Sequence, residues 1–316
     1  MATTTSITTT YSGEFAGKYI AAALLSAPTL EKGGMVIHPN VKYKQVIQKV
    51  ATDDIVKNAT CDFTATSTIT LTEKVLNPEE FQVNLQLCKK DFHNTWQSME
   101  MGYGAFDVLP KSFADFLIAH VAEKVSAAME TTIWTGANAT AGQFDGIATQ
   151  IAADADLPSA QEVTGTTVTA SNVIAELGKI VDALPARLYG KDDLTIYVAN
   201  NIYRAYVRAL GGFAASGVGA NGYDNKGANQ VIDALYFDGV KIFLANGLAS
   251  NTAIATLSSN LHFATGLLND MNQVKVLDMA DLDGSENVRV VMRFTADAKY
   301  GFAGDIVTYG ITNSAN

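Results

Sequence analysis

The stretch PKSFADFLIAHVAEKVSAAMETTIWTGANATAGQFDGIATQ, residues 110–150, predicts one long helix followed by a glycine-rich turn. Pro110 suits the first helical position and Gly136 supplies a stop, after which we expect a short apolar strand. The helix carries no nucleophile, metal cluster or phosphate-binding loop, so the pattern favours a structural role. Apolar side chains at helical spacing form one stripe, with Phe116 and Ile133 at its edges: Phe113, Leu117, Val121, Val125, Met129 and Thr132.

Composition excludes several classes of protein. The chain has 316 residues, 48% hydrophobic and 17% charged, which is enough to bury a sizeable core. A dedicated nucleic-acid binder should carry a basic stripe, but the formal net charge is −10 and the lysines and arginines are scattered in the sequence. No apolar run approaches the length of a membrane span, and the first residues lack the pattern of a signal peptide. We therefore expect a protein made in the cytoplasm.

Residues 44–90 are strand-like on both sides of Asn77-Pro78. Residues 68–75 alternate weakly between apolar and polar side chains, whereas the run that follows Pro78 alternates cleanly. We expect the two runs to form one long antiparallel ribbon, and such a ribbon is marginal in water unless another surface covers it. Its apolar residues are therefore candidates for contact with another copy of the chain: Phe81, Val83, Leu85 and Leu87.

The first residues predict an arm rather than a domain. Residues 1–12 are rich in threonine and predict a flexible tail, and residues 13–27 predict a short helix closed by Pro28. Phe15 and Tyr19 on that segment are further candidates for contact with a neighbouring subunit.

The second half of the chain predicts an α/β unit. Ser171 is a plausible cap for a helix over residues 171–184. A buried strand over residues 194–199 leads into a third helix, which Asn200 would cap. Asp238-Gly239 predicts a hairpin turn, and several short strand runs follow to the end of the chain.

None of the candidate chemical sites has the sequence context that its chemistry requires. Gly217, Gly219 and Gly222 have the glycine spacing of a dinucleotide fingerprint, but they lie in the loop 211–229, after a helix rather than after a strand. The four histidines are far apart in the sequence, and none has a metal partner at helical spacing. We predict no catalytic, cofactor-binding or metal-binding residues, and no enzymatic activity.

The order of these elements resembles a known architecture. A polar arm and a long ribbon lead to a long helix that ends in ETTIWTG, residues 130–136, and continues into GQFDGI, residues 142–147. A smaller α/β part with YVANNIYRAYVRALGG, residues 197–212, and long closing strands follow. From about residue 10 to the end, the chain resembles the major capsid protein of tailed bacteriophages, with the α+β fold called the Hong Kong 97-type fold.

The resemblance implies a division of the chain into parts. They are an N-terminal arm (1–43), an extended β-hairpin loop (44–90), a peripheral domain (91–187) with its spine helix at about 110–135, an axial domain (188–285), and closing strands of the peripheral domain (286–316). The segment that contains Gly217, Gly219 and Gly222 would be an axial loop, which makes these residues candidate subunit contacts.

The resemblance also implies a function. Such a chain would assemble with itself into the pentamers and hexamers of an icosahedral shell, located in the virion and made in the cytoplasm of the host bacterium. The shell would enclose double-stranded DNA without sequence-specific binding. Portal and scaffold proteins, and in some shells a decoration protein, would be its partners. The lysine, asparagine and glutamate that crosslink some members of this family have no residue-by-residue match here, so crosslinking is not implied.

Two alternatives remain open at this stage. An encapsulin, which is a bacterial compartment of the same fold that holds an enzyme cargo, would show a groove for a cargo tail on its inner face. A cytoplasmic α/β enzyme built on the strand and helix of residues 194–210 would need convergent polar groups in a pocket.

Overall fold

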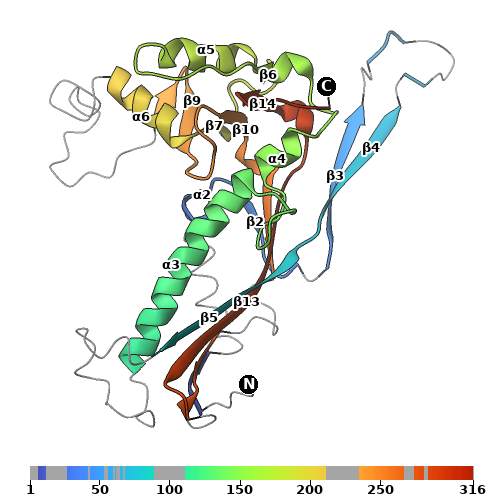
Figure 1. Ribbon diagram of the computed structural model, residues 1–316. Coiled ribbons are helices and arrows are strands. Elements are labelled where there is room, and N and C mark those ends of the chain that lie inside the picture. Colours follow the sequence, from blue (N-terminus) through green and yellow to red (C-terminus); the bar gives the residue numbers. More distant parts are fainter. Residues whose placement is uncertain are drawn as a thin grey trace.

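The computed structural model describes residues 6–11, 27–41, 43–52, 56–59, 61, 65–66, 68–88, 111–210, 235–266, 274–280 and 284–315. Figure 1 shows a long helix that lies over a long sheet, a compact α/β part at one end of both, and a two-stranded ribbon that stands clear of the rest. None of the described helices combines the length and hydropathy of a membrane span.

The long helix α3 spans Lys111–Thr135, as the sequence predicts for about 110–135. Its buried face is formed by side chains three or four positions apart, which lie on one side of a helix. Ile133 is fully buried rather than at the edge of this face. The residues of the face are Leu117, Ile118, Val121, Val125, Met129 and Ile133. The side chains of Phe113 and Phe116 lie outside the described residues.

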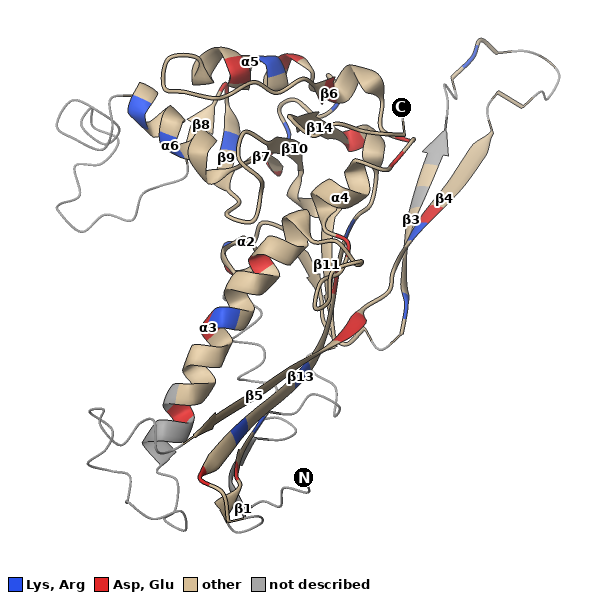
Figure 2. Cartoon of the chain, in the orientation of Figure 1, with Lys and Arg blue, Asp and Glu red and all other residues tan. Residues whose placement is uncertain are grey.

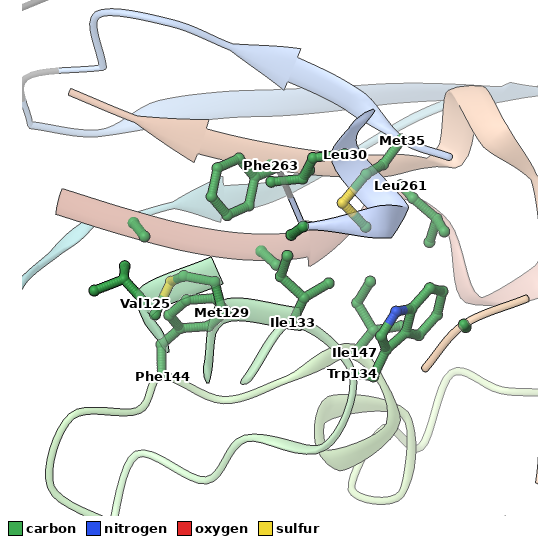
Figure 3. Packing of buried hydrophobic residues seen from close by; sticks show 14 of the residues in the cluster. Leu30, Met35, Val125, Met129, Ile133, Trp134, Phe144, Ile147, Leu261 and Phe263 are labelled. Atoms are coloured by element: carbon green, nitrogen blue, oxygen red, sulfur yellow. The ribbon is translucent and has the colours of Figure 1, made fainter. Parts of the chain in front are cut away.

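The long sheet has the strand order β1-β12-β13-β11-β2, with β5 paired to β13. Its longest strand is β13 (Asn287–Tyr300), in which every second side chain from Val288 to Tyr300 is buried. This strict alternation places one face of the sheet against α3, and Figure 3 shows side chains of α3 meeting those of the sheet and of α2. The other strands are β1 (Ser6–Tyr11), β2 (Val36–His38), β5 (Glu79–Cys88), β11 (Leu261–Thr265) and β12 (Val274–Asp278).

The ribbon consists of β3 (Gln45–Thr52) and β4 (Ile69–Leu76), paired antiparallel along their whole length. We expected the runs on the two sides of Asn77-Pro78 to pair with each other, and this was wrong, because β5 pairs with β13. The link has no residue at positive φ, whereas the tight turns of hairpins require positive φ and proline fixes φ near −65°. The chain therefore passes from the ribbon into the long sheet at Asn77-Pro78 instead of turning back.

The α/β part is built on a second sheet with the order β6-β14-β10-β7-β9-β8. Its strands are β6 (Glu162–Val163), β7 (Leu194–Val198), β8 (Tyr236–Phe237), β9 (Val240–Leu244), β10 (Ala253–Leu257) and β14 (Ile306–Tyr309). The helices α5 (Val173–Asp182) and α6 (Asn200–Ala209) pack on it. The described residues include the short 3-10 helices η3 (Ser159–Gln161), which precedes β6, and η4 (Ser258–Asn260) and η5 (Ala303–Asp305), which connect strands.

The boundaries of this part differ from those that the resemblance implied. The second core includes α5 and β14, which lie outside residues 188–285, and it excludes β11 and β12, which belong to the long sheet. Local patterns could not show this, because the chain crosses between the two sheets several times. The predicted hairpin at Asp238-Gly239 is confirmed, with φ of 46° and 79°. Ser171 and Asn200 are not caps, since the capping positions are Asn172 and Ala199.

The turn after α3 explains the spacing of its glycines. A Cβ on Gly136 would lie 2.4 Å from the carbonyl oxygen of Phe144, and a Cβ on Gly146 would lie 2.7 Å from the nitrogen of Gly136. The Gly146 N–H donates to the Gly136 carbonyl at 2.9 Å, so the two backbones touch. The segment that follows is the short helix α4 (Ile147–Ile151), not the strand that we expected. A short apolar run does not by itself distinguish a buried helix from a strand.

The N-terminal segment is partly built into the fold. Residues 6–11, which we expected to be a flexible tail, form β1 and pair with β12. Pro28 opens the helix α2 (Pro28–Glu31) rather than closing one, and the helix expected over residues 13–27 falls almost wholly outside the described residues. The buried carboxylate of Glu130 on α3 accepts hydrogen bonds from the backbone N–H of Thr29 at 3.0 Å and from its hydroxyl at 2.6 Å. These bonds fix α2 to the long helix.

Candidate assembly surfaces

The ribbon exposes an apolar face. Val46 lies opposite Val75 and Val50 lies opposite Leu71, so these side chains share one face of the two strands. Val50 is 62% exposed, Leu71 58% and Ile69 73%. We call this set the ribbon face: Val46, Val50, Ile69, Leu71 and Val75. The Gln48–Glu73 pair is its only polar interruption among the described side chains. A face that exposes several large apolar side chains in this way is a candidate interaction site.

The base of the ribbon is held by its opposite face. Leu76 is fully buried and packs with Val41, Ala264 and the partly buried Ile47. Lys74 Nζ lies 2.6 Å from a carboxylate oxygen of Asp154 and 3.9 Å from the ring centroid of Tyr300. The Tyr300 hydroxyl also donates to Asp154. These contacts attach the ribbon to the body near its base, and the ribbon extends away from the body (Figure 1).

Two carboxyls near the base of the ribbon have pKa values that are shifted in opposite directions. Burial alone would raise the pKa of Asp154, but hydrogen bonds from Lys74 and Tyr300 outweigh it and lower the pKa. Asp297 on β13 accepts the backbone N–H of Asn77 at 2.8 Å, and burial raises the pKa of its carboxyl to about 6. Both carboxyls lie close to the point where the chain leaves the ribbon. As the pH falls, Asp297 is therefore protonated well before Asp154.

Three of the predicted contact residues on β5 pack inside their own chain. Phe81, Val83 and Leu87 are half-buried against the core under α3. The ring of Phe81 lies 5.7 Å from that of Phe294 and 6.1 Å from that of Phe144, measured between centroids. This packing covers part of the apolar face that suggested these three residues, and their role as subunit contacts stays a prediction. Leu85 is 47% exposed, and its role in a contact stays a prediction.

The remaining predicted contact residues cannot be placed. Phe15, Tyr19, Gly217, Gly219 and Gly222 lie outside the described residues. The ribbon face was missed because the weak alternation of residues 68–75 was noted without its pairing partner on β3. The signal was available: apolar residues at 69, 71 and 75 alternate with polar ones, and Val46 and Val50 have the same spacing.

Cationic side chains gather on the outer face of the long sheet. Arg289, Arg293 and Lys299 occupy alternating positions on β13 and therefore point to one side, and Lys275 on β12 lies opposite Val291 on that same side. Blue segments recur along β13 in Figure 2. Arg289 donates from Nε to the side-chain oxygen of Gln86 on β5 at 2.8 Å. Cations that looked scattered in the sequence thus form a short row, because a strand turns every second residue to one face.

The structure also joins two histidines that the sequence separates. Nε2 of His38 and Nδ1 of His262 are 3.0 Å apart, although the residues are 224 positions apart in the chain. Among the described residues, no group of histidine, cysteine, aspartate or glutamate side chains could hold a metal ion. No local pattern in the sequence could have paired these two residues.

Comparison with known proteins identifies the fold. No protein-family model and no curated protein matches the sequence. Among solved structures, the capsid of a native GTA particle is similar to this chain with a TM-score of 0.59 and 11% identity, over 92% of this chain and 90% of that one. The satellite phage P4 procapsid structure that includes the size determination protein is similar with a TM-score of 0.54 and 11% identity, over 93% and 98%. The capsid of cyanophage P-SCSP1u is similar with a TM-score of 0.55 and 11% identity, over 90% and 88%. The chain therefore has the α+β fold of bacteriophage capsid proteins, the Hong Kong 97-type fold.

Proposed function

We propose that the chain is a structural capsid subunit that assembles with copies of itself into the pentamers and hexamers of an icosahedral shell. The observation that carries the proposal is the ribbon face, an apolar surface on a ribbon that projects from a body with a capsid fold. A two-stranded ribbon is marginal in water, and its stability improves when another surface covers its apolar side. A second copy of the chain is the partner that a self-assembling fold supplies.

The contact between copies would be head-to-tail. The ribbon face of one subunit would lie on a different surface of the next, and such heterologous contacts generate rings when the rotation closes. A stable contact buries about 1,200–2,000 Å² in total, which a projecting ribbon supplies more readily than a compact body. The basic row of β13 is short and includes the carboxyl of Asp297 on the same face. It suits an acidic group on a neighbouring subunit better than a long phosphate backbone.

Within this proposal each part of the fold has a role. We assign the ribbon β3–β4 to the extended loop, and α3 with the long sheet to the peripheral domain. The second sheet with α5 and α6 would be the axial domain, with residues 211–229 as the loop near the symmetry axes. Phe15, Tyr19 and the glycines of that loop remain predicted contact residues.

The shell would enclose double-stranded DNA and form part of a virion made in a bacterial host. A net charge of −10 agrees with a container that does not bind its DNA tightly, because firm binding to phosphate needs many lysines and arginines. Portal and scaffold proteins would be its partners, and it would have no enzymatic activity.

Assembly of a charged variant tests the proposal. Leu71→Lys places a cation in the ribbon face, and we expect a folded subunit that forms rings or shells at least tenfold less efficiently. Ile174→Lys is the matched control, since Ile174 on α5 is 52% exposed and lies in the other part of the molecule. Negative-stain microscopy and sedimentation would count the particles. Unchanged assembly of Leu71→Lys, or a wild-type protein that stays monomeric under every assembly condition, would contradict the proposal.

A further inference from the structure

Each strand of the ribbon is tied to the body by its own polar cluster. At the β3 end, Gln45 contacts His38 of β2, which contacts His262 of β11; we call these three residues the histidine chain. At the β4 end, Lys74 contacts Asp154 and Tyr300; we call these three the lysine cluster. The two clusters flank the small apolar contact that Leu76 makes at the base.

Hydrogen positions in the histidine chain follow from the amide of Gln45. Its Nε2 lies 3.0 Å from Nδ1 of His38, and since the amide nitrogen only donates, that ring nitrogen accepts. The hydrogen of His38 is then on Nε2, which donates to Nδ1 of His262 at 3.0 Å. Both hydrogen bonds are compatible with two neutral rings. If Nδ1 of His262 gains a proton, its N–H faces the N–H on Nε2 of His38. The two N–H groups avoid each other only if both hydrogen bonds of the histidine chain reverse direction, which requires the side-chain amide of Gln45 to flip.

Few charges near the histidine chain would help it accept a proton. Lys299 of β13 lies directly opposite His262 and on the same face of the sheet. Asp297, two residues before Lys299 on that face, is the nearby carboxyl of β13. On the ribbon, Lys44 precedes Gln45, and Lys74 lies opposite Ile47. Lys74 is already paired with Asp154, and burial is the main cause that disfavours positive charge on the two rings.

We propose that the base of the ribbon is an acid-sensitive hinge. Protonation of His38 and His262 releases the β3 end of the ribbon, and the ribbon then pivots on the lysine cluster at the β4 end. The inference concerns the free subunit and does not depend on the proposed function.

The titration of the two rings has the sign that the hinge needs. Burial lowers the pKa of His38, and burial together with His38 lowers the pKa of His262 from 6.5 to about 4. The closed base therefore binds fewer protons than the open base between these values, so acidification favours the open base. The ratio of open to closed base increases by up to about tenfold for each pH unit between 6.5 and 4.

The lysine cluster at the β4 end keeps its contacts over the same pH range. The pKa of Asp154 is lowered, because the bonds from Lys74 and Tyr300 outweigh burial, so its carboxylate stays charged and paired with Lys74. Burial raises the pKa of Asp297 to about 6, so this carboxyl beside Asn77 takes up a proton as the pH falls through 6, and the closed base binds that proton more tightly than an open base would. Acid therefore weakens one strand's attachment and spares the other, which makes the motion a pivot rather than a detachment.

The two native cysteines provide the test. Cys61 is exposed in the segment that joins β3 and β4, and Cys88 ends β5 in the body of the molecule. Nitroxide labels on both would report the distance from ribbon to body by pulsed electron paramagnetic resonance. We expect a single narrow distribution at pH 7.5, and at pH 5 a broader distribution with a shifted mean, in protein whose circular dichroism shows that it is still folded. The same distribution at both pH values would overturn the hinge.

Variants separate the histidine chain from other effects of acid. His262→Gln keeps a hydrogen-bonding side chain that cannot be protonated near pH 5, and we expect it to abolish the change with pH. His120→Gln, an exposed position on α3, is the matched control and should respond like the wild type. If His262→Gln does not fold, the titration of the wild-type histidines by NMR decides, since a His262 pKa at or above 6.5 contradicts the proposal.

Discussion

The β5–β13 pair and the β3–β4 ribbon are built alike and end differently. Both are antiparallel pairs with apolar side chains on one face. On β13 that face is buried under α3, whereas on the ribbon Val50 and Leu71 remain exposed. Local sequence pattern makes the face, but a third layer is needed to cover it. For β13 the same chain supplies that layer, and for the ribbon we propose that another copy does.

The largest effect is expected from a substitution in the covered β5–β13 pair. Phe294 on β13 is 4% exposed and packs beside Phe81. Phe294→Ala removes a large side chain from a packed core, and we expect a loss of about 3–5 kcal/mol in the free energy of unfolding. Urea denaturation of the subunit would measure it. A loss below about 1 kcal/mol would mean that the sheet is not packed against α3 in this way.

The next largest effect on stability is expected from a substitution in the turn that follows α3. Gly136→Ala would put a methyl group 2.4 Å from the Phe144 carbonyl oxygen, and we expect it to cost about 1–3 kcal/mol. Gly178→Ala is the matched control, because nothing lies within 4 Å of that position in α5. The control should gain about 0.5–1 kcal/mol from better helix propensity. Equal effects of the two substitutions in thermal unfolding would refute the close approach at Gly136.

A pH-dependent effect tests the junction between the ribbon and the long sheet. Burial raises the pKa of Asp297 from 3.8 to about 6, so the folded chain holds this proton more tightly than the unfolded chain. Its contribution to stability is therefore present below pH 3.8 and is lost as the pH rises through 6. Asp297→Asn should stabilise the protein by about 1–2 kcal/mol at pH 7.5, and the gain should disappear near pH 4. A variant that is less stable than the wild type at pH 7.5 would show that the charged carboxylate is needed there.

The smallest expected effect is on the uncovered pair. Leu71→Ala should change the free energy of unfolding of the free subunit by less than about 0.5 kcal/mol, because the side chain is already exposed. The same substitution should reduce the yield of assembled particles. A loss as large as that of Phe294→Ala would show that the ribbon face is covered within its own chain, and the comparison of the two pairs would then fail.

Much of the fold could be predicted because alternation and helical spacing are local signals. The stripe on α3 and the turn at Asp238-Gly239 each lie within a short stretch, and both were predicted. The partner of a strand is not a local property. Asn77-Pro78 looked like a hairpin connection only because β4 and β5 are adjacent in the sequence.

The candidate sites were harder to predict for the same reason. Leu87 has the pattern of an exposed apolar face, but it is half-buried against the core of its own chain. His38 and His262 come together through the parallel pairing of β2 with β11, which no spacing in the sequence reveals. The basic row on β13 was accessible, since Arg289 and Arg293 are an even number of residues apart on one strand.

A cryo-electron microscopy reconstruction of the assembled particle tests the central claim most directly. The account predicts that Val50, Ile69 and Leu71 of each subunit lie against another subunit and are shielded from solvent. A particle in which these side chains face solvent in every subunit, or contact only their own chain, would contradict it.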